Sequence, residues 1–196
     1  ALLVSPSGEL NGKYDKIHLV PYGEYVPFGE YLSLGSLGEG IGNFKSGKEI
    51  SNFSLPQGKM GVLICFEIIF PDLCRRFVKG GANFLVTITN DAWFGRTSAP
   101  YQHFSMATFR AVENRVFIAR AANTGITGLI DPKGKILNRG GIFTEEAMNG
   151  TIQLSKNKTF YTLYGDVFAW LGSAFSIFLL AYALFKKSKN IKLKGR

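Results

Sequence analysis

The stretch that decides the fold is Met60-Gly-Val-Leu-Ile-Cys-Phe-Glu-Ile-Ile-Phe-Pro-Asp72. The apolar run 62–64 predicts a buried strand, and the proline and aspartate at 71–72 predict a helix over 71–78. Cys65 lies at the corner, near a helix N-terminus whose partial positive charge favours thiolate over thiol. Such a corner suits a nucleophile. The alternative is a buried free cysteine that only packs.

The composition indicates one sizeable folded domain. The chain has 196 residues, of which 46% are hydrophobic and 14% aromatic, so a disordered chain is excluded. The formal net charge is +9, but six basic residues lie within the last eleven positions, and without them the charge would be about +3. A net charge this small does not indicate a polyanionic partner, and we expect no nucleic-acid partner.

The two cysteines, Cys65 and Cys74, make neither a disulfide framework nor a zinc site. A bridge between them stays open at this stage, and it would block a nucleophilic role for Cys65. The sequence has no zinc-ligand spacing, no phosphate-binding glycine loop and no dinucleotide fingerprint. We therefore expect no metal and no cofactor.

Strands alternate with helices along the chain, which predicts α/β layers. The chain lacks an initiator methionine and a signal peptide and opens inside an expected strand, so we expect a piece of a longer protein. The Gly-rich, apolar segment 28–44 is either a packed surface loop or a mobile lid. Strands are expected over 2–5, 11–19, 50–55, 62–64, 83–89, 116–121, 126–130, 135–137 and 151–154, and helices over 71–78 and 100–115.

Residues 167–185 are nineteen positions without a charge. At about 1.5 Å per residue this is the length that spans the hydrocarbon of a bilayer. Aromatic side chains at one end (Tyr161, Tyr164, Trp170) and lysines at the other are typical of the two membrane boundaries. We predict a transmembrane helix with a cytoplasmic C-terminus, which places the globular part outside, and the alternative is a buried core helix.

Three residues are candidates to assist Cys65. Lys16 lies between apolar positions before a Pro/Gly loop, where it would stabilise a thiolate and later an oxyanion. Glu24, in that loop, would orient the lysine through an ion pair. Glu67 either faces the site or only balances charge. The alternative for Lys16 is an ordinary surface lysine.

Other polar and aromatic residues favour structural roles. His18 and His103 are acid–base candidates, but neither has a carboxylate at an informative spacing. Arg110 and Glu113 are one helical turn apart, which predicts a structural ion pair. The loop after 83–89 either lines a pocket or is tied down by Asn and Asp side chains, with its tryptophan packed as filler. Its pocket candidates are Asn90, Trp93 and Phe94.

Five motifs in order give the chain a family resemblance. It resembles the apolipoprotein N-acyltransferase family, the membrane-bound, lipid-modifying branch of the nitrilase superfamily, over about residues 1–170. The motifs are KIHLVPYGEYVP at 16–27, ICFE at 64–67, NDAWFG at 90–95, PYQH at 100–103 and RAANTG at 120–125.

The resemblance implies a nitrilase-like α-β-β-α sandwich followed by one C-terminal transmembrane helix. Residues 1–160 would be the C-terminal portion of the catalytic domain, 161–187 the transmembrane helix with its aromatic start, and 188–196 a basic cytoplasmic tail. The first strands of the sandwich, further membrane helices and the general-base glutamate of the family would precede residue 1. The chain alone is then expected to be inactive.

The resemblance also assigns roles within a Glu-Lys-Cys triad. It implies that Cys65 is the nucleophile, Lys16 the oxyanion-stabilising lysine and Glu24 an auxiliary glutamate, with Glu67 and Trp93 at further active-site positions. Phe66 stands where the family usually has tyrosine, so a hydroxyl is lost while its backbone N–H remains able to serve the oxyanion. The family needs no cofactor.

The implied reaction moves an acyl chain from a phospholipid, through a Cys65 thioester, to the N-terminal amine of a lipoprotein's diacylglyceryl-cysteine. The implied location is the bacterial inner membrane, with the catalytic domain on the periplasmic side. Segment 28–44 would gate lipid entry. Two alternatives remain: a nitrilase-type amidase acting on a small soluble substrate, and a membrane-anchored domain with a decayed site that only binds lipoproteins.

Overall fold

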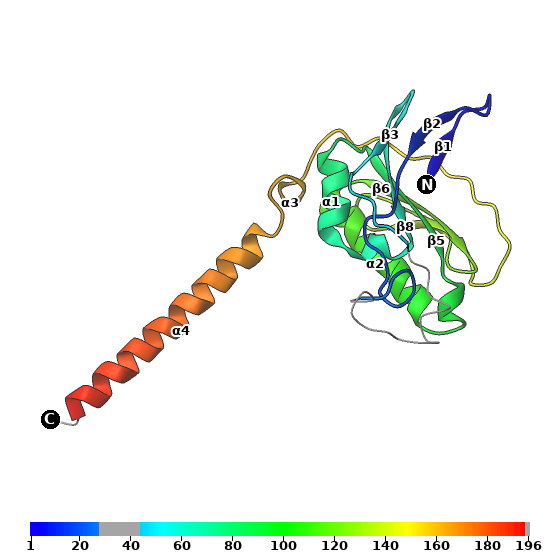
Figure 1. Cartoon of the computed structure of the whole chain (residues 1–196). Helices are drawn as coiled ribbons and strands as arrows, with labels where there is room; N and C mark the ends of the chain where they lie inside the picture. The colour runs from blue at the N-terminus through cyan, green and yellow to red at the C-terminus, as the bar shows by residue number, and fades with distance from the viewer. Residues whose placement is uncertain (28–43, 195–196) are drawn as a thin grey trace. The chain divides into compact units, whose positions relative to one another are not determined.

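The computed structural model describes residues 1–27 and 44–194, with side chains to residue 187 (Figure 1). It divides into two units, Ala1–Leu163 and Tyr164–Arg196, each considered by itself. The lid hypothesis for segment 28–44 lies outside the described residues, apart from Phe44 at its end.

A six-stranded sheet organises the first unit, in the order β3-β4-β5-β6-β7-β8. The central strands β4 (Gly58–Ile64), β5 (Phe84–Asn90) and β6 (Phe117–Asn123) run parallel. Parallel strands end at one edge of a sheet, so the segments after β4, β5 and β6 emerge on the same side. The antiparallel outer strands are β3 (Asn52–Leu55), β7 (Gly128–Ile130) and β8 (Ile136–Arg139).

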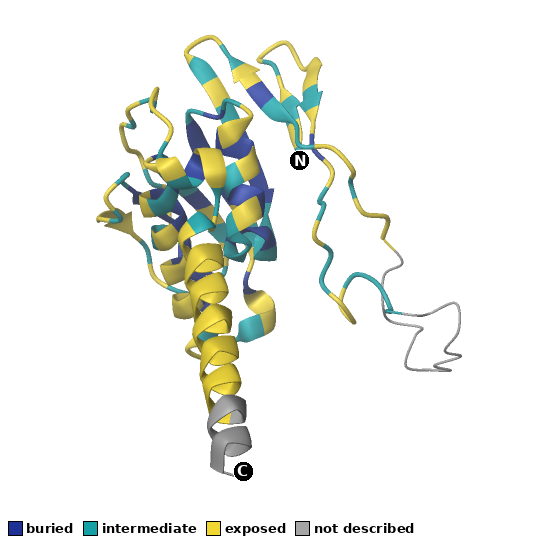
Figure 2. Ribbon diagram, turned by 90° about the vertical axis from the view of Figure 1, so that its left-hand side faces the viewer, coloured by how far each residue is buried: buried dark blue, intermediate teal, exposed yellow. Residues whose placement is uncertain are grey.

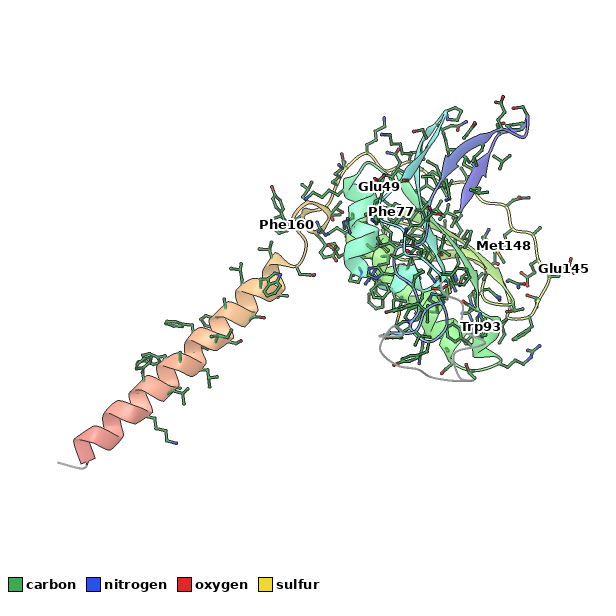
Figure 3. The ribbon with its side chains drawn as sticks, in the orientation of Figure 1. Glu49, Phe77, Trp93, Glu145, Met148 and Phe160 are labelled. Carbon is green, nitrogen blue, oxygen red and sulfur yellow. The ribbon has the colours of Figure 1, made fainter. Side chains whose placement is uncertain are left out.

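Two helices, α1 (Pro71–Lys79) and α2 (Ala99–Asn114), pack on one face of this sheet. The approach is close, because a Cβ built on Gly61 of β4 would lie 3.1 Å from the Cβ of Phe77 in α1. Figure 2 shows buried segments on the helices as well as on the strands, and Figure 3 labels Phe77, a fully buried residue of α1. On α2, Ala111 is buried whereas its neighbour Val112 is exposed. The core includes Leu63, Phe77, Leu85, Phe104, Ile118 and Ile130.

The other face of the sheet is apolar but only partly covered. Val86 and Ala119, partners in register on β5 and β6, are half-buried, and Ile88 is exposed. In a two-sheet sandwich, a face of this kind packs against the second sheet. The described residues thus supply one sheet and one helix layer of the predicted α-β-β-α sandwich.

The strands β1 (Leu2–Val4) and β2 (Leu10–Lys13) form a separate antiparallel pair. The expected strand over 11–19 is wrong beyond Lys13. The backbone N–H groups of Ile17 and His18, which a strand ladder would use, donate instead to the Glu67 side chain. The expected strand over 151–154 does not form either.

A long helix, α4 (Val167–Lys194), makes up most of the second unit and follows the short α3 (Phe160–Tyr164). Its segment Val167–Lys187 has a mean hydropathy of 2.0 and is long and apolar enough to cross a membrane. None of that segment is buried, so the alternative of a core helix is not supported. An apolar helix of this length is expected to lie in lipid rather than in water.

Candidate active site

Cys65 is the first residue of η2 (Cys65–Ile69), a short 3-10 helix that follows β4 directly. Its φ is +55°, a left-handed conformation that costs a non-glycine residue about 1–2 kcal/mol. Such strain is concentrated at functional sites. The predicted position at the N-terminus of α1 is wrong, because η2 separates Cys65 from Pro71 and the field of a helix end fades within its first turn.

The two cysteines differ in their surroundings. Both thiols are free, which excludes the Cys65–Cys74 bridge. Cys65 is half-buried, whereas Cys74 lies fully buried in α1. Burial raises the pKa of the Cys74 thiol far above its ordinary value, so that this sulfur stays protonated at neutral pH.

We expect iodoacetamide at neutral pH to alkylate Cys65 in the folded protein and to leave Cys74 unmodified, because the accessible thiolate is the reactive form. Mass spectrometry of the two cysteine peptides measures this difference. Protein unfolded in urea is the control, in which both thiols react. Equal labelling in the folded state would contradict the structural difference between the two sulfurs.

Glu67 joins the segment of Lys16 to the corner of Cys65. Its carboxylate is fully buried and accepts four hydrogen bonds, three on Oε1 and one on Oε2. Because the donors include neighbours of both Lys16 and Cys65, one buried charge holds the two segments together. The donors are the Tyr14 hydroxyl (2.8 Å) and the backbone N–H groups of Ile17 (2.7 Å), His18 (3.1 Å) and Ile64 (2.8 Å).

Tyr14 contributes to this junction in a fixed protonation state. Its side chain is fully buried and its ring packs edge-on against Phe77. Burial, together with the negative charge of Glu67, raises the pKa of Tyr14 far above its ordinary value. The hydroxyl therefore remains a hydrogen-bond donor at neutral pH.

Lys16 and Glu24 form a close ion pair. The Lys16 Nζ lies 2.7 Å from Oε1 and 2.8 Å from Oε2 of Glu24, and the Lys16 side chain is 9% exposed. The backbone N–H of Val20 also donates to Oε2. This carboxylate fixes the ammonium while tying down the loop that follows it.

An aromatic cluster surrounds the corner. The ring of Phe66 lies 6.2 Å from that of Phe70 and 5.9 Å from that of His103, which also meets Phe94 edge-on at 6.0 Å. His18 stacks on Phe70 at 4.1 Å between ring centroids. The tyrosine-to-phenylalanine difference at position 66 therefore falls in a mainly aromatic environment.

The loop after β5 contains the short helix η3 (Ala92–Phe94). Asn90 accepts a hydrogen bond from the backbone N–H of Ala92 at 3.1 Å, which supports the predicted tying of this loop. Trp93 is 88% exposed, so the alternative that it packs as filler is wrong (Figure 3). Arg110 donates to Glu113 at 2.7 Å, as the helical spacing predicted.

A buried charged cluster was missed by the sequence analysis. Asp91, which follows β5, contacts His103 of α2 at 3.0 Å and Arg120 of β6 at 2.6 Å. The sequence spacing indicated no carboxylate partner for either histidine. In the structure His103 has one, Asp91, which lies twelve positions before it in the sequence. One signal was available: Arg120 is a lone charge in the otherwise apolar run 116–122.

The sequence model of carbon-nitrogen hydrolases matches residues 1–160. The chain belongs to the carbon-nitrogen hydrolase family. Curated proteins similar to it include apolipoprotein N-acyltransferases. The one from Geobacter metallireducens is 51% identical over 96% of this chain and 36% of its own length. The one from Thermotoga maritima is 33% identical over 97% of this chain and 38% of its own. This carbon-nitrogen hydrolase chain therefore spans a little over a third of these relatives.

Solved structures confirm the nitrilase-like fold. Nit3 of Saccharomyces cerevisiae, a nitrilase-superfamily member, has 25% identity and a TM-score of 0.51 over 70% of this chain and 47% of its own. An amidase mutant from Nesterenkonia sp. AN1 has 22% identity and a TM-score of 0.52 over 72% of this chain and 50% of its own. In that amidase an acetamide moiety is covalently added at the active-site cysteine. The family match and the unburied apolar helix together indicate a membrane-associated enzyme.

Proposed function

We propose that the protein containing this chain is an apolipoprotein N-acyltransferase that uses Cys65 as its nucleophile. One observation favours lipid substrates over a small soluble amide: the strained cysteine corner of a carbon-nitrogen hydrolase is followed by an unburied apolar helix. An amidase acting in water has no use for such a helix. Two relatives, at 51% and 33% identity, carry the name apolipoprotein N-acyltransferase.

In the first half-reaction, the Cys65 thiolate attacks the ester carbonyl of a phospholipid. A carbon–sulfur bond forms, the carbonyl oxygen becomes an oxyanion, and the ammonium of Lys16 stabilises that charge. The carbon–oxygen bond to glycerol then breaks. The lysophospholipid leaves as an alcohol after taking a proton, and an acyl thioester remains on Cys65.

In the second half-reaction, the α-amine of the diacylglyceryl-cysteine attacks the thioester. The carbon–nitrogen bond forms and the carbon–sulfur bond breaks, while the attacking free amine gives one proton to the general base and keeps one N–H in the neutral amide. The Cys65 thiolate is regenerated. Because the lysophospholipid leaves before the lipoprotein reacts, ping-pong kinetics are expected.

Proton transfer is assigned to a glutamate outside residues 1–196, as the family resemblance implies. The two glutamates beside the site are poor general bases. Glu24 is paired through both oxygens with Lys16, and both oxygens of Glu67 accept buried hydrogen bonds. Protonation of either carboxylate would weaken the contacts that it makes, to the Lys16 ammonium in one case and to buried donors in the other.

The proposed location is the bacterial inner membrane. The catalytic unit would lie on the periplasmic side, and the basic residues at the C-terminal end of α4 would lie in the cytoplasm, following the positive-inside rule. Both substrates are anchored in the bilayer, so a site tethered to its surface meets them there. We keep the proposal that segment 28–44 gates lipid entry, and charged substitutions at Leu34 and Leu37 are its test.

The function is tested with protein of the length of its relatives, in mixed micelles of phospholipid and a diacylglyceryl lipopeptide. Mass spectrometry is expected to show one added acyl chain on the lipopeptide amine and an equal amount of lysophospholipid. Parallel lines in double-reciprocal plots would support the thioester intermediate. Hydrolysis of small amides without acyl transfer would establish the amidase alternative instead.

We expect the isolated chain 1–196 to show no acyl transfer in the same assay, because Glu24 and Glu67, the two glutamates beside the site in the described part of the chain, are already engaged in other contacts. Circular dichroism, and alkylation of Cys65 without alkylation of Cys74, would show that the chain is folded. Turnover above the enzyme-free background would overturn the assignment of the base to residues outside this chain.

A further inference from the structure

We propose that Arg120 is a positioning residue for the reacting sulfur: its buried guanidinium, fixed by Asp91, lies beneath the corner of Cys65 and stabilises the thiolate. This inference rests on the proposed function only in giving that thiolate a task. The charge in question is that of Arg120 on β6, which is separate from the Lys16–Glu24 ion pair in the loop after β2.

The ion pair between Arg120 and Asp91 is completely removed from solvent. Both side chains have zero exposure, and Nη2 of Arg120 lies 2.6 Å from Oδ2 of Asp91. The Nε of Arg120 donates to the backbone carbonyl of Ile126 at 3.1 Å, so the guanidinium is held at two points. Buried ion pairs cost desolvation energy and are weak evidence for stability, which makes a specific role for this one worth testing.

The position of Arg120 follows from the sheet. Arg120 pairs in register with Thr87 of β5, which pairs with Leu63 of β4, two residues before Cys65. Because these three side chains point to the same face, Arg120 lies on the helix side of the sheet, at the level where β4 ends. His103 connects the cluster to the corner, since its Nδ1 contacts both charges and its ring faces that of Phe66.

The charge of Arg120 acts on the sulfur. Burial lowers the pKa of Arg120 below its ordinary value, while the negative charges of Asp91 and of the Cys65 thiolate act in the opposite direction. Coulomb interaction is reciprocal, so a thiolate that favours the charged guanidinium is itself favoured by it. Asp91 stays ionised beside it: burial opposes its charge, but hydrogen bonding from His103 and the charge of Arg120 outweigh burial and lower the pKa of Asp91.

The guanidinium of Arg120 also has an unused hydrogen-bond donor. Among the described residues, its buried Nη1 has no hydrogen-bond partner, and the same holds for Oγ1 of the adjacent Thr87 and for Nε2 of His103. Buried polar atoms are normally paired, so three unpaired atoms in one cluster call for an explanation. A guanidinium kept partly unpaired beneath a nucleophile is available to respond when that nucleophile becomes charged.

The charged and titratable groups around the sulfur come from every neighbouring element. Asp91 directly follows β5, Arg120 is on β6, and His103 is on α2. Glu67 is on η2, and Lys16 is on the segment that Glu67 binds. Arg120 and Lys16 are the cations of this group. Removing either one is expected to disfavour the thiolate, and removing Asp91 is expected to favour it.

The test follows iodoacetamide labelling of the Cys65 peptide against pH, using full-length protein in detergent. Arg120→Gln is expected to raise the pH midpoint of labelling by about half to one unit. It is expected to lower acyl transfer about three- to tenfold at neutral pH, because one full unit of midpoint changes the thiolate fraction by about tenfold. Arg120→Lys keeps the charge and is expected to restore most of the midpoint.

Arg110→Gln is the matched control, because Arg110 is another mostly buried arginine paired with a carboxylate on the same unit. Equal midpoints for Arg110→Gln and Arg120→Gln, or for the Lys and Gln variants of Arg120, would overturn the proposal. Should Arg120→Gln not fold, Asp91→Asn is expected to lower the midpoint, and an unchanged or raised midpoint would overturn it equally.

The two readouts separate this inference from the proposed function. Labelling requires no lipid, so a midpoint shift in Arg120→Gln establishes the electrostatic role even if the wild-type protein transfers no acyl chain. A wild-type enzyme that is active, with a midpoint that Arg120→Gln does not move, leaves the acyltransferase assignment intact and refutes the role of Arg120.

Discussion

Replacement of Cys65 by alanine is expected to abolish acyl transfer, with a loss of more than about 10⁴-fold in kcat, because no sulfur is then present to form the acyl thioester. Release of lysophospholipid and acylation of the lipopeptide amine should disappear together, since the first half-reaction supplies the second. Liquid chromatography with mass spectrometry measures both products from one incubation.

Cys74→Ala is the matched control for this experiment. Cys74 is the other free thiol of the described chain, and its Sγ lies near the backbone carbonyls of Glu67 and Ile68 in the core. Its loss should cost about 1 kcal/mol of stability through packing and leave turnover unchanged. Turnover that survives in Cys65→Ala and fails in Cys74→Ala would show that the wrong sulfur has been assigned.

Glu67→Gln is expected to have the second-largest effect, because all four of its hydrogen-bond partners are donors. The new amide nitrogen is itself a donor, so at least one buried N–H or O–H group must lose its acceptor. Each such loss costs about 1–3 kcal/mol. We expect a drop of about 2–4 kcal/mol in the free energy of unfolding.

Activity should fall further than stability alone explains. Glu67 holds the backbone beside Lys16 to the backbone beside Cys65, and a displacement of about 1 Å between reacting groups costs about 100-fold in rate. Denaturant unfolding and kcat, measured on the same preparation, test both effects.

Two variants bracket this result. Tyr14→Phe removes one of the four donors without creating a clash, and it should cost about 1 kcal/mol. Glu145→Gln changes an exposed glutamate and should change neither quantity (Figure 3). If Glu67→Gln proved no more harmful than Tyr14→Phe, Glu67 would not be the residue that joins the two segments.

The strands and helices were largely predictable because their side-chain periodicity is local. The run before Cys65, the run 83–89 and the apolar span after residue 166 each carry their signal within a few residues. The strand expected over 11–19 failed for a non-local reason. Its backbone N–H groups are bound by the side chain of Glu67, about fifty positions along the chain.

The candidate site was also predictable only where its contacts are local in the sequence. Lys16, Glu24 and Cys65 stand in recognisable motifs, and the Lys16–Glu24 pair lies within one loop. The cluster of Asp91, His103 and Arg120 depends on the parallel register of β5 and β6 and on the packing of α2, which no local pattern encodes. Sequence spacing could place a charge in a buried strand but could not name its partner.

The backbone angle at Cys65 has a consequence for evolution as well as for chemistry. A φ of +55° suits glycine best, and a glycine there would relax the turn and stabilise the folded protein by about 1 kcal/mol relative to alanine. Thermal unfolding of the two inactive variants, Cys65→Gly and Cys65→Ala, would measure that difference. An exchange of Cys65 for glycine would therefore gain stability and lose the sulfur, so the two requirements oppose each other at this position.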